Sequence, residues 1–451
     1  MHHILAVGIV SMMFCQSEPG AESGVIIVTS FLGNKGPGWK DSIDVAGAVG
    51  PRHIVGFDVA GFTVHTKEMG SVVKRLSPRE FWDQVHPSGT LVPVAQPNDA
   101  RILYDPLSER WFACAAGTIE PDCFLAVSTS SDPTNPWNGA RLPLPRFNPY
   151  MKMGVDRNGL YICSYSLAQD LRKGMICYAI PKQDAVAERG PVLGRAQTFT
   201  GLYMSTMPAT DPDPCKPRDA PAVLLANEYL EGTCSELYLY RINWSGQQAS
   251  ITEAQTVRLH RTYLVPDNST PQMEAVQPIP GPRLRAGGGG RRIDSAFVRN
   301  GRIYGCNGAK RAPDSRPGVL WYEVRISDGA LLQEGFVDSP DRDYIFPSIA
   351  VDSRGNIGIG CTGTSASEFP SVYVMMRAAT DPPNTMREPV LAVPGTTAYR
   401  SDGMPAVNWS HYSTTCVDPS SPDILWTYQA YACSDLNRVW CTAWAAFQLV
   451  H

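Results

Sequence analysis

A short phrase recurs along this chain of 451 residues and constrains its fold more than any other feature. An apolar run leads into a tight turn, such as Asp105-Pro106 or Asn300-Gly301, and a second run follows that ends in small residues. Strong copies occupy residues 100–114, 153–163, 295–306 and 347–361, and residues 412–426 hold a looser copy. Each copy is typical of a β-hairpin, because these turn residues supply the geometry that joins two antiparallel strands. Repetition of hairpins at a period of about 50–70 residues predicts strands arranged radially, as in a β-propeller.

Seven repeat units can be counted when two weaker copies, at residues 53–67 and 221–242, are included. The units are expected to start near Val49, Asp99, Lys152, Pro221, Arg292, Pro347 and Gly403. Second hairpins follow several copies, which predicts four strands per unit. Residues 25–29 are expected to complete the last sheet and close the ring, which removes exposed edge strands. We therefore predict an all-β fold, a seven-bladed β-propeller of four-stranded antiparallel blades that forms a single domain over residues 24–451, with almost no helix.

The N-terminal segment and the cysteines indicate the compartment. Residues 1–23 have a short apolar core followed by small residues, which is typical of a secretory signal peptide and too short for a membrane-spanning helix. We expect a protein that is secreted, either extracellular or periplasmic, and not inserted into a membrane. Twelve cysteines fit an oxidising compartment, although buried free thiols are the alternative. At least one of the pairs Cys114–Cys123, Cys163–Cys177 and Cys433–Cys441 is expected to form a disulfide.

Charge and motifs exclude several functions. A formal net charge of −4 without a basic run argues against a nucleic-acid partner and against anionic membranes. The sequence has no phosphate-binding loop, Gly-x-Ser-x-Gly elbow or dinucleotide fingerprint, so no cofactor is required. A calcium ion in the channel is compatible with Asp99 and Asp294 but is not required by them. We expect a monomer.

Several stretches resemble a broad group of secreted β-propellers. They include Ala48-Val-Gly-Pro-Arg-His-Ile-Val, residues 99–112, 126–134, 346–356 and 377–383, and Trp409-Ser-His-Tyr-Ser-Thr-Thr-Cys-Val-Asp-Pro. The group is similar to seven-bladed polysaccharide lyases, such as ulvan lyases and rhamnose–glucuronate lyases, and the likeness covers most of the chain from Val49 onward. The resemblance implies a carbohydrate-active protein whose partner is an acidic polysaccharide or oligosaccharide. The sialidase Asp-box is absent; Ser130-Ser-Asp-Pro-Thr-Asn-Pro-Trp137 only distantly resembles it.

The residues that enter the innermost strand of each blade are the candidates for ligand contacts, because they ring one mouth of the channel. The candidate substrate-binding residues are Asp99, Arg101, Tyr150, Lys152, Arg291, Asp294, Trp409 and His86. His411, Tyr412 and Arg292 are the candidate catalytic residues. Elimination across a uronate needs a base, an acid and a cation that neutralises the carboxylate. His411 and Tyr412 could exchange the protons and Arg292 could hold the carboxylate. A structural histidine, a packed tyrosine and an arginine salt bridge are the alternatives for these three residues.

Three functions follow from these residues. The first is a polysaccharide lyase that cleaves a uronate-containing glycan by β-elimination, and we favour this enzyme from the sequence. The second is a sialidase-like glycoside hydrolase, which Arg101, Arg291 and Arg292 permit. The third is a non-catalytic propeller that binds a glycan or a protein.

Overall fold

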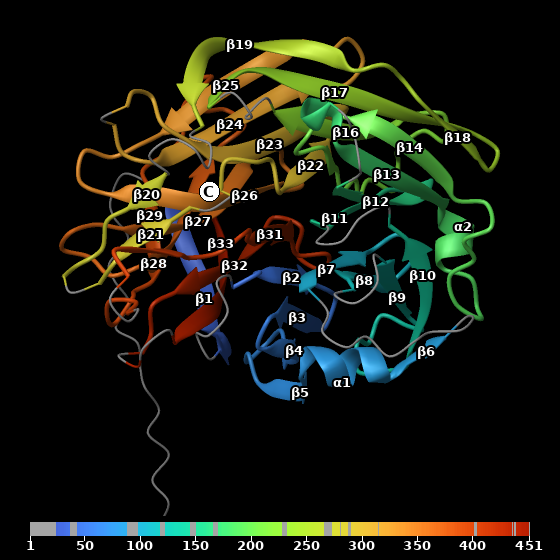
Figure 1. Cartoon of the computed structure of the whole chain (residues 1–451), viewed down its shortest axis with the longest axis horizontal. Coiled ribbons are helices and arrows are strands. Elements are labelled where there is room, and N and C mark those ends of the chain that lie inside the picture. The colour runs from blue at the N-terminus through green and yellow to red at the C-terminus, as the bar shows by residue number, and fades with distance from the viewer. Residues whose placement is uncertain are drawn as a thin grey trace, which may run out of the picture.

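A computed structural model shows that the protein is a seven-bladed β-propeller. The structure describes residues 24–36, 43–87, 98–117, 122–144, 150–165, 170–227, 232–265, 273–279, 281–286, 290–313, 315–400, 404–434, 436 and 439–450. The expected signal peptide, residues 1–23, lies outside the described residues. Figure 1 shows the sheets set around a common centre, with β2, β7, β11, β22, β26 and β31 nearest the middle.

The first four blades follow the chain in order. Blade 1 contains β2 (Ala46–Val49), β3 (His53–Asp58), β4 (Gly61–Thr66) and β5 (Val72–Leu76). Blade 2 contains β7 (Asn98–Asp105), β8 (Arg110–Ala116), β9 (Asp122–Ser128), β10 (Trp137–Pro143) and an added outer strand, β6 (Val85–Pro87). Blade 3 contains β11 (Lys152–Val155), β12 (Gly159–Tyr165), β13 (Met175–Pro181) and β14 (Gln197–Leu202). Blade 4 contains β15 (Met207–Pro208), β16 (Ala222–Asn227), β17 (Thr233–Ser245), β18 (Gln248–Ile251) and β19 (Gln255–Leu264).

The other three blades complete the ring. Blade 5 contains β22 (Ala296–Arg299), β23 (Arg302–Ala309), β24 (Gly318–Arg325) and β25 (Leu331–Val337). Blade 6 contains β26 (Asp343–Val351), β27 (Ile357–Thr364), β28 (Ser371–Arg377) and β29 (Val390–Val393). Blade 7 contains β31 (Thr414–Val417), β32 (Leu425–Tyr431), β33 (Trp440–Leu449) and β1 (Val25–Gly36). A small separate sheet holds β20 (Glu274–Ala275), β21 (Arg283–Arg285) and β30 (Ala406–Asn408).

The ring closes through the N-terminal strand, as the sequence predicts. β1 pairs antiparallel with β33, with Val25 opposite Leu449 and Gly36 opposite Trp440. In Figure 1 this blue strand lies against the red C-terminal strands. The two ends of the described chain therefore share one sheet, and blade 7 needs both of them to reach four strands.

Helix is scarce in the described part of the chain. It holds only α1 (Pro78–Asp83), α2 (Lys182–Ala185) and the 3-10 turn η1 (Leu171–Lys173). No helix among the described residues is long and apolar enough to cross a membrane. This part of the chain therefore has the near absence of helix that the sequence predicts.

The aspartate of the repeated phrase has a structural role. In five blades a buried aspartate ends or directly follows a strand of the phrase, and its carboxylate accepts backbone N–H groups of the turn: Asp58, Asp105, Asp156, Asp352 and Asp418. Such side-chain-to-backbone bonds fix a tight turn between two strands. Three of these aspartates also hold a lysine from the next blade of the ring, through Lys182–Asp105, Lys216–Asp156 and Lys67–Asp418 contacts. The phrase therefore supplies both the hairpin turn and a link between neighbouring blades.

Blade 4 begins earlier than the sequence suggests. Its innermost strand is β15, at Met207, whereas residue Pro221 precedes its second strand, β16. β15 contains two residues and residues 209–221 separate it from β16, so no compact hairpin phrase marks the start of this blade. A hairpin with a long connection leaves no local signal, which explains the difference.

The disulfide prediction is confirmed for one pair. Cys433 and Cys441 are bonded, with their Cα atoms 5.7 Å apart. Cys163 and Cys177 face each other across β12 and β13 as free thiols. Cys114 lies opposite Leu125 rather than Cys123, so that pair is diagonal in the sheet and also free. The register of each hairpin therefore decides which cysteines can meet.

Candidate functional site

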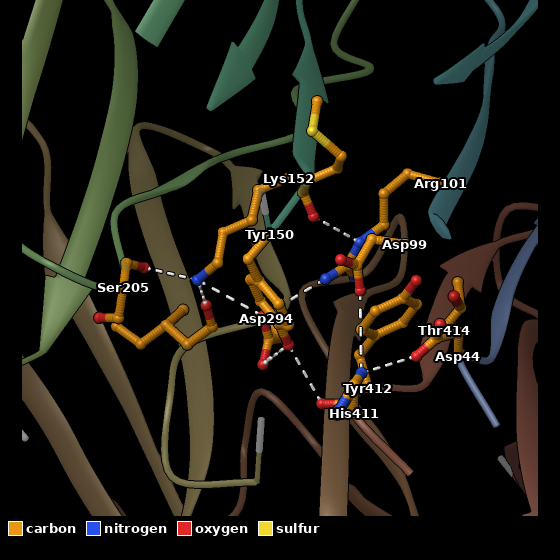
Figure 2. A network of polar contacts seen from close by, with 12 residues as sticks. Asp44, Asp99, Arg101, Tyr150, Lys152, Ser205, Asp294, His411, Tyr412 and Thr414 are labelled. Carbon is orange, nitrogen blue, oxygen red and sulfur yellow. Dashed lines mark hydrogen bonds and ion pairs between the residues drawn. The ribbon is translucent and has the colours of Figure 1, made fainter. Parts of the chain in front are cut away.

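Polar side chains from several blades meet where the innermost strands begin, and we call this the entry end of the channel. Asp99 and Arg101 lie in β7, and Lys152 begins β11. Asp44, Ser205, Asp294 and His411 precede β2, β15, β22 and β31 by a few residues. Figure 2 shows these side chains directed toward one another. The sequence expectation that strand-entry residues gather at one end of the channel therefore matches their placement.

Two of the entry aspartates have unusual backbone geometry. Asp44 has φ of 48° and Asp99 has φ of 50°, in the left-handed region that residues with a Cβ rarely adopt. Short polar residues tolerate this region best. The conformation at Asp99 coincides with a register shift between Asn98 and Arg101 in β7. Blades 1 and 2 therefore both begin with an aspartate in a strained conformation beside the channel.

His411 lies between these two aspartates. Its Nδ1 is 2.7 Å from Asp44 Oδ1 and 3.7 Å from Asp99 Oδ1 (Figure 2). Burial by itself lowers the pKa of His411, but the two carboxylates outweigh burial and raise the pKa to about 10. Burial raises the pKa of Asp99, and the neighbouring charge of Asp44 adds to that rise against the lowering effect of His411. At neutral pH His411 is therefore a cation, which a general base cannot be.

Asp294 is the centre of a second group of contacts. Tyr150 donates its hydroxyl to Asp294 Oδ2 at 3.0 Å, and Lys152 Nζ and an Arg101 guanidinium nitrogen lie 3.4 Å and 3.5 Å from Oδ1 (Figure 2). Tyr150 also lies within hydrogen-bond distance of the His411 carbonyl oxygen, at 3.2 Å. The carboxylate of blade 5 is therefore satisfied by groups from blades 2 and 3.

Lys152 is completely buried and bonded within the protein. Its ammonium donates to the carbonyl oxygens of Ser205, at 2.8 Å, and Ile293. Burial lowers its pKa to about 8, despite the opposing effect of Asp294. A side chain with this set of partners links blades 3, 4 and 5 and has no surface left for a ligand.

Tyr412 and Arg101 form a stacked pair in the core of the entry end. The Arg101 guanidinium carbon lies 3.3 Å from the centroid of the Tyr412 ring, and the Tyr412 hydroxyl donates to the Ala100 carbonyl at 2.9 Å. Tyr412 is only 1 % exposed, and burial raises its pKa well above the ordinary value. Its proton is therefore held inside the protein.

The remaining sequence candidates lie in different places. Arg292 packs over the rings of Tyr150 and Tyr165, at 4.7 Å and 5.5 Å, beside the Asp294 group. Arg291 is buried next to it, and its carbonyl oxygen accepts from Asn227. Trp409 is buried and its indole N–H donates to Thr362 at 3.3 Å. His86 lies in β6, the outermost strand of blade 2, so the structure does not bring it to the channel.

The sequence candidates do not include Asp44 and Ser205, which complete the network. Asp44 supplies the closest carboxylate to His411, and the Ser205 carbonyl holds Lys152. A signal for Asp44 exists in the chain, because Asp44 and Asp294 each stand two residues before an innermost strand. The Ser205 contact could not be predicted, because every residue has a backbone carbonyl and the residue type does not show which one binds a lysine.

Beyond this network, the central channel holds a cavity of about 470 Å³. Residues from all seven innermost strands line it, and Arg101 and Asp294 bound it toward the entry end. Its other boundary is made by turn residues after these strands, among them Pro106, Leu107, Pro214 and Pro419. Pro214 is exposed and the others are partly exposed, so this second end, which we call the turn end, meets solvent.

Comparison with known proteins finds similarity in structure alone. No protein-family model matches the chain, and no curated protein matches it by sequence. The solved structures to which it is similar include Kluyveromyces lactis Hsv2, at 9% identity and a TM-score of 0.38, over 89% of this chain and 97% of that one. They also include the Cps50 (Swd1) β-propeller domain of Myceliophteria thermophila, at 8% identity and a TM-score of 0.41, over 94% of this chain and all of that one.

The prediction of a polysaccharide lyase is wrong. The two structural neighbours named above are Hsv2 and a Cps50 (Swd1) propeller domain, and neither is named as a lyase or a sialidase. The geometry gives the physical reason. The Tyr412 hydroxyl and the His411 imidazole, which were expected to exchange protons with a glycan, are engaged with Ala100 and with two aspartates. What the structure and the comparisons show together is the β-propeller fold.

Proposed function

We propose that the protein is a non-catalytic binding propeller that takes its ligand in the cavity of the central channel. The observation that carries this proposal is the 470 Å³ cavity lined by all seven innermost strands. Its volume is within the range of natural ligand sites, about 300–1,000 Å³. The cavity also reaches solvent at the turn end, which gives a ligand a route of entry.

The lining favours an apolar segment of a protein over a glycan. Small and apolar side chains such as Ala48, Met153 and Val417 line the cavity, together with the hydroxyls of Thr414 and Thr415. Tyr104 and Phe297 add aromatic surface to this lining. Prolines at the turn end add rigid apolar surface at little cost in entropy. We infer that a short peptide with an apolar side chain fits this channel best.

The polar network supports binding rather than chemistry. Asp99, Arg101, Lys152 and Asp294 are each at most 8 % exposed, and their charges are matched to one another. Networks of this kind hold blades in register. The acidic glycan that the sequence suggests stays a prediction, and the experiment below tests it as well.

Secretion remains part of the proposal. The Cys433–Cys441 disulfide supports it, because disulfides persist in oxidising compartments.

A binding screen with a cavity-filling variant tests this function. Fluorescent synthetic peptides with apolar or mixed apolar and acidic side chains, and a panel of uronate oligosaccharides, are titrated into the protein and followed by fluorescence polarisation. Val417→Trp fills the channel, and Met69→Trp places the same ring on a side chain that is 80 % exposed and is not part of the cavity lining. We expect a peptide to bind the wild type and the Met69→Trp variant equally, and Val417→Trp to weaken it at least tenfold, or about 1.4 kcal/mol.

Two results would overturn the proposal. Peptide affinity that is the same in both variants would place the ligand outside the channel. Binding of the oligosaccharides alone would replace the protein ligand by a glycan.

A further inference from the structure

Three side chains that can ligate a metal ion meet at the entry end. The Asp44 and Asp99 carboxylates and the His411 imidazole each offer one atom, and these atoms all lie within 4.8 Å of one another. Among the described residues no other group of three His, Cys, Asp or Glu side chains meets this condition. We propose that Asp44, Asp99 and His411 bind a divalent transition-metal ion, of the class of Zn²⁺ or Mn²⁺.

The contacts of His411 differ from those of the other ion-paired histidines. His53 lies 3.7 Å from Asp132, and His260 lies 3.5 Å from Glu334, so each has a single carboxylate neighbour. His411 Nδ1 is buried and faces two carboxylates, with Asp44 Oδ1 at 2.7 Å and Asp99 Oδ1 at 3.7 Å. One imidazole nitrogen and two carboxylate oxygens that face one another in this way offer three ligand atoms of the types that transition-metal sites use.

Burial makes a second cation at this place favourable. Asp44 is 5 % exposed and Asp99 is 8 % exposed, so water screens their repulsion poorly. One imidazolium supplies a single positive charge for two carboxylates, although Arg101 also lies near Asp99. A divalent ion supplies two charges and releases the imidazole proton, so that the neutral ring becomes a ligand.

The ligand set selects the class of ion. Imidazole nitrogen with carboxylate oxygen suits zinc, manganese and iron, whereas calcium and magnesium prefer oxygen ligands alone. Bonds of about 2.0–2.2 Å would place the three ligand atoms about 3–4 Å apart, so the present spacing requires only small side-chain movements. The His411 side chain is 32 % exposed, which leaves one face of the site open to water.

The position of the site indicates what a bound ion would do for the fold. Asp44 precedes the first strand of blade 1, Asp99 belongs to blade 2 and His411 precedes the first strand of blade 7. The ion would join three blades that meet next to the ring closure. It would bind at the entry end and does not depend on a ligand in the cavity.

Calorimetry on the full-length, tag-free protein tests the site. All proteins carry His2→Ala and His3→Ala, because adjacent histidines bind these ions themselves, and are stripped with a chelator. ZnCl2 and MnCl2 are the probes, with CaCl2 and MgCl2 for comparison. We expect one equivalent of Zn²⁺ to bind, Asp99→Asn and His411→Gln to weaken it at least about tenfold, and His260→Ala to leave it unchanged.

A second measurement needs no variant of the site. Cu²⁺ with ascorbate and oxygen oxidises the histidines that ligate it, and peptide mass spectrometry locates the product. Oxidation concentrated at His411 in the folded wild type supports the site even where a variant fails to fold. Oxidation at His260 or His53 instead of His411, or equal Zn²⁺ affinity in Asp99→Asn and His260→Ala, would overturn the proposal.

Discussion

Replacing the buried Lys152 by methionine should cost more stability than replacing any surface lysine. Methionine fills a similar volume but donates no hydrogen bond, so two backbone carbonyls and Asp294 each lose a donor. An unsatisfied buried acceptor costs about 1–3 kcal/mol, and breaking a buried ion pair costs about 3–5 kcal/mol. Tyr150 and Arg101 still contact Asp294, which moderates the loss. We expect the free energy of unfolding to fall by about 3–5 kcal/mol.

Lys67→Met is the matched control. Lys67 Nζ lies 2.7 Å from Asp418, but that carboxylate keeps hydrogen bonds from the backbone N–H groups of Ser420 and Ser421 and from the Trp426 indole. We therefore expect Lys67→Met to lower the free energy of unfolding by only about 1 kcal/mol. Urea unfolding followed by tryptophan fluorescence and circular dichroism measures both variants.

A double variant separates the charge from the packing. Asp294→Asn removes the carboxylate that Lys152→Met leaves without its ammonium partner, so the double variant should lose clearly less than the sum of the two single losses. Two results would refute the network described at the entry end. One is an equal decrease in the free energy of unfolding for Lys152→Met and Lys67→Met, and the other is a strictly additive decrease in the double variant.

Further predictions concern single groups of the ring. Burial, which outweighs the hydrogen bonds from Tyr428 and Asn34, raises the pKa of Asp58 from 3.8 to about 6. The folded state therefore binds more protons than the unfolded state between these values, and this group makes the free energy of unfolding fall as the pH rises through that window. Asp58→Asn should flatten the pH dependence in urea unfolding between pH 4 and 6, and an unchanged slope would contradict the shift. Tyr412→Phe should cost about 1–3 kcal/mol in the same assay, because the Ala100 carbonyl loses its donor, while a change below about 0.5 kcal/mol would show that this bond matters little. Cys433→Ser should cost about 2–3 kcal/mol by opening a loop of sequence separation 8, and non-reducing peptide mapping should find Cys433 joined to Cys441 and not to another cysteine.

The hairpins of this fold could be predicted because their causes are local. Turn residues such as Asn300-Gly301 and Asp105-Pro106 act on the residues beside them, and the alternation of a strand lies within the strand itself. Seven copies of such a unit leave few architectures other than a closed ring. Even the closing strand, β1, could be predicted, because an apolar run was left over at the N-terminus. Blade 4 could not be delimited, because β15 and β16 lie far apart in the chain.

The meeting of strand-entry residues could also be predicted, but not their state. Sequence identifies His411, Asp99, Arg101 and Lys152 as neighbours at one mouth of a channel. It does not show that His411 faces Asp44, which is far away in the chain, or that Lys152 points into backbone carbonyls. These contacts depend on the distances between blades and on burial, which convert candidate acids and bases into matched charges.

The residue types at the entry end were therefore determined by the sequence, and their chemistry by the tertiary structure. A histidine and a tyrosine are potential proton-transfer groups in any chain. Their chemistry depends on the partners that the fold gives them. Here the His411 imidazole faces aspartates of blades 1 and 2, and the Tyr412 hydroxyl donates to Ala100 of blade 2. The cavity likewise arises only when seven innermost strands surround one axis, because no single strand encodes the space between them.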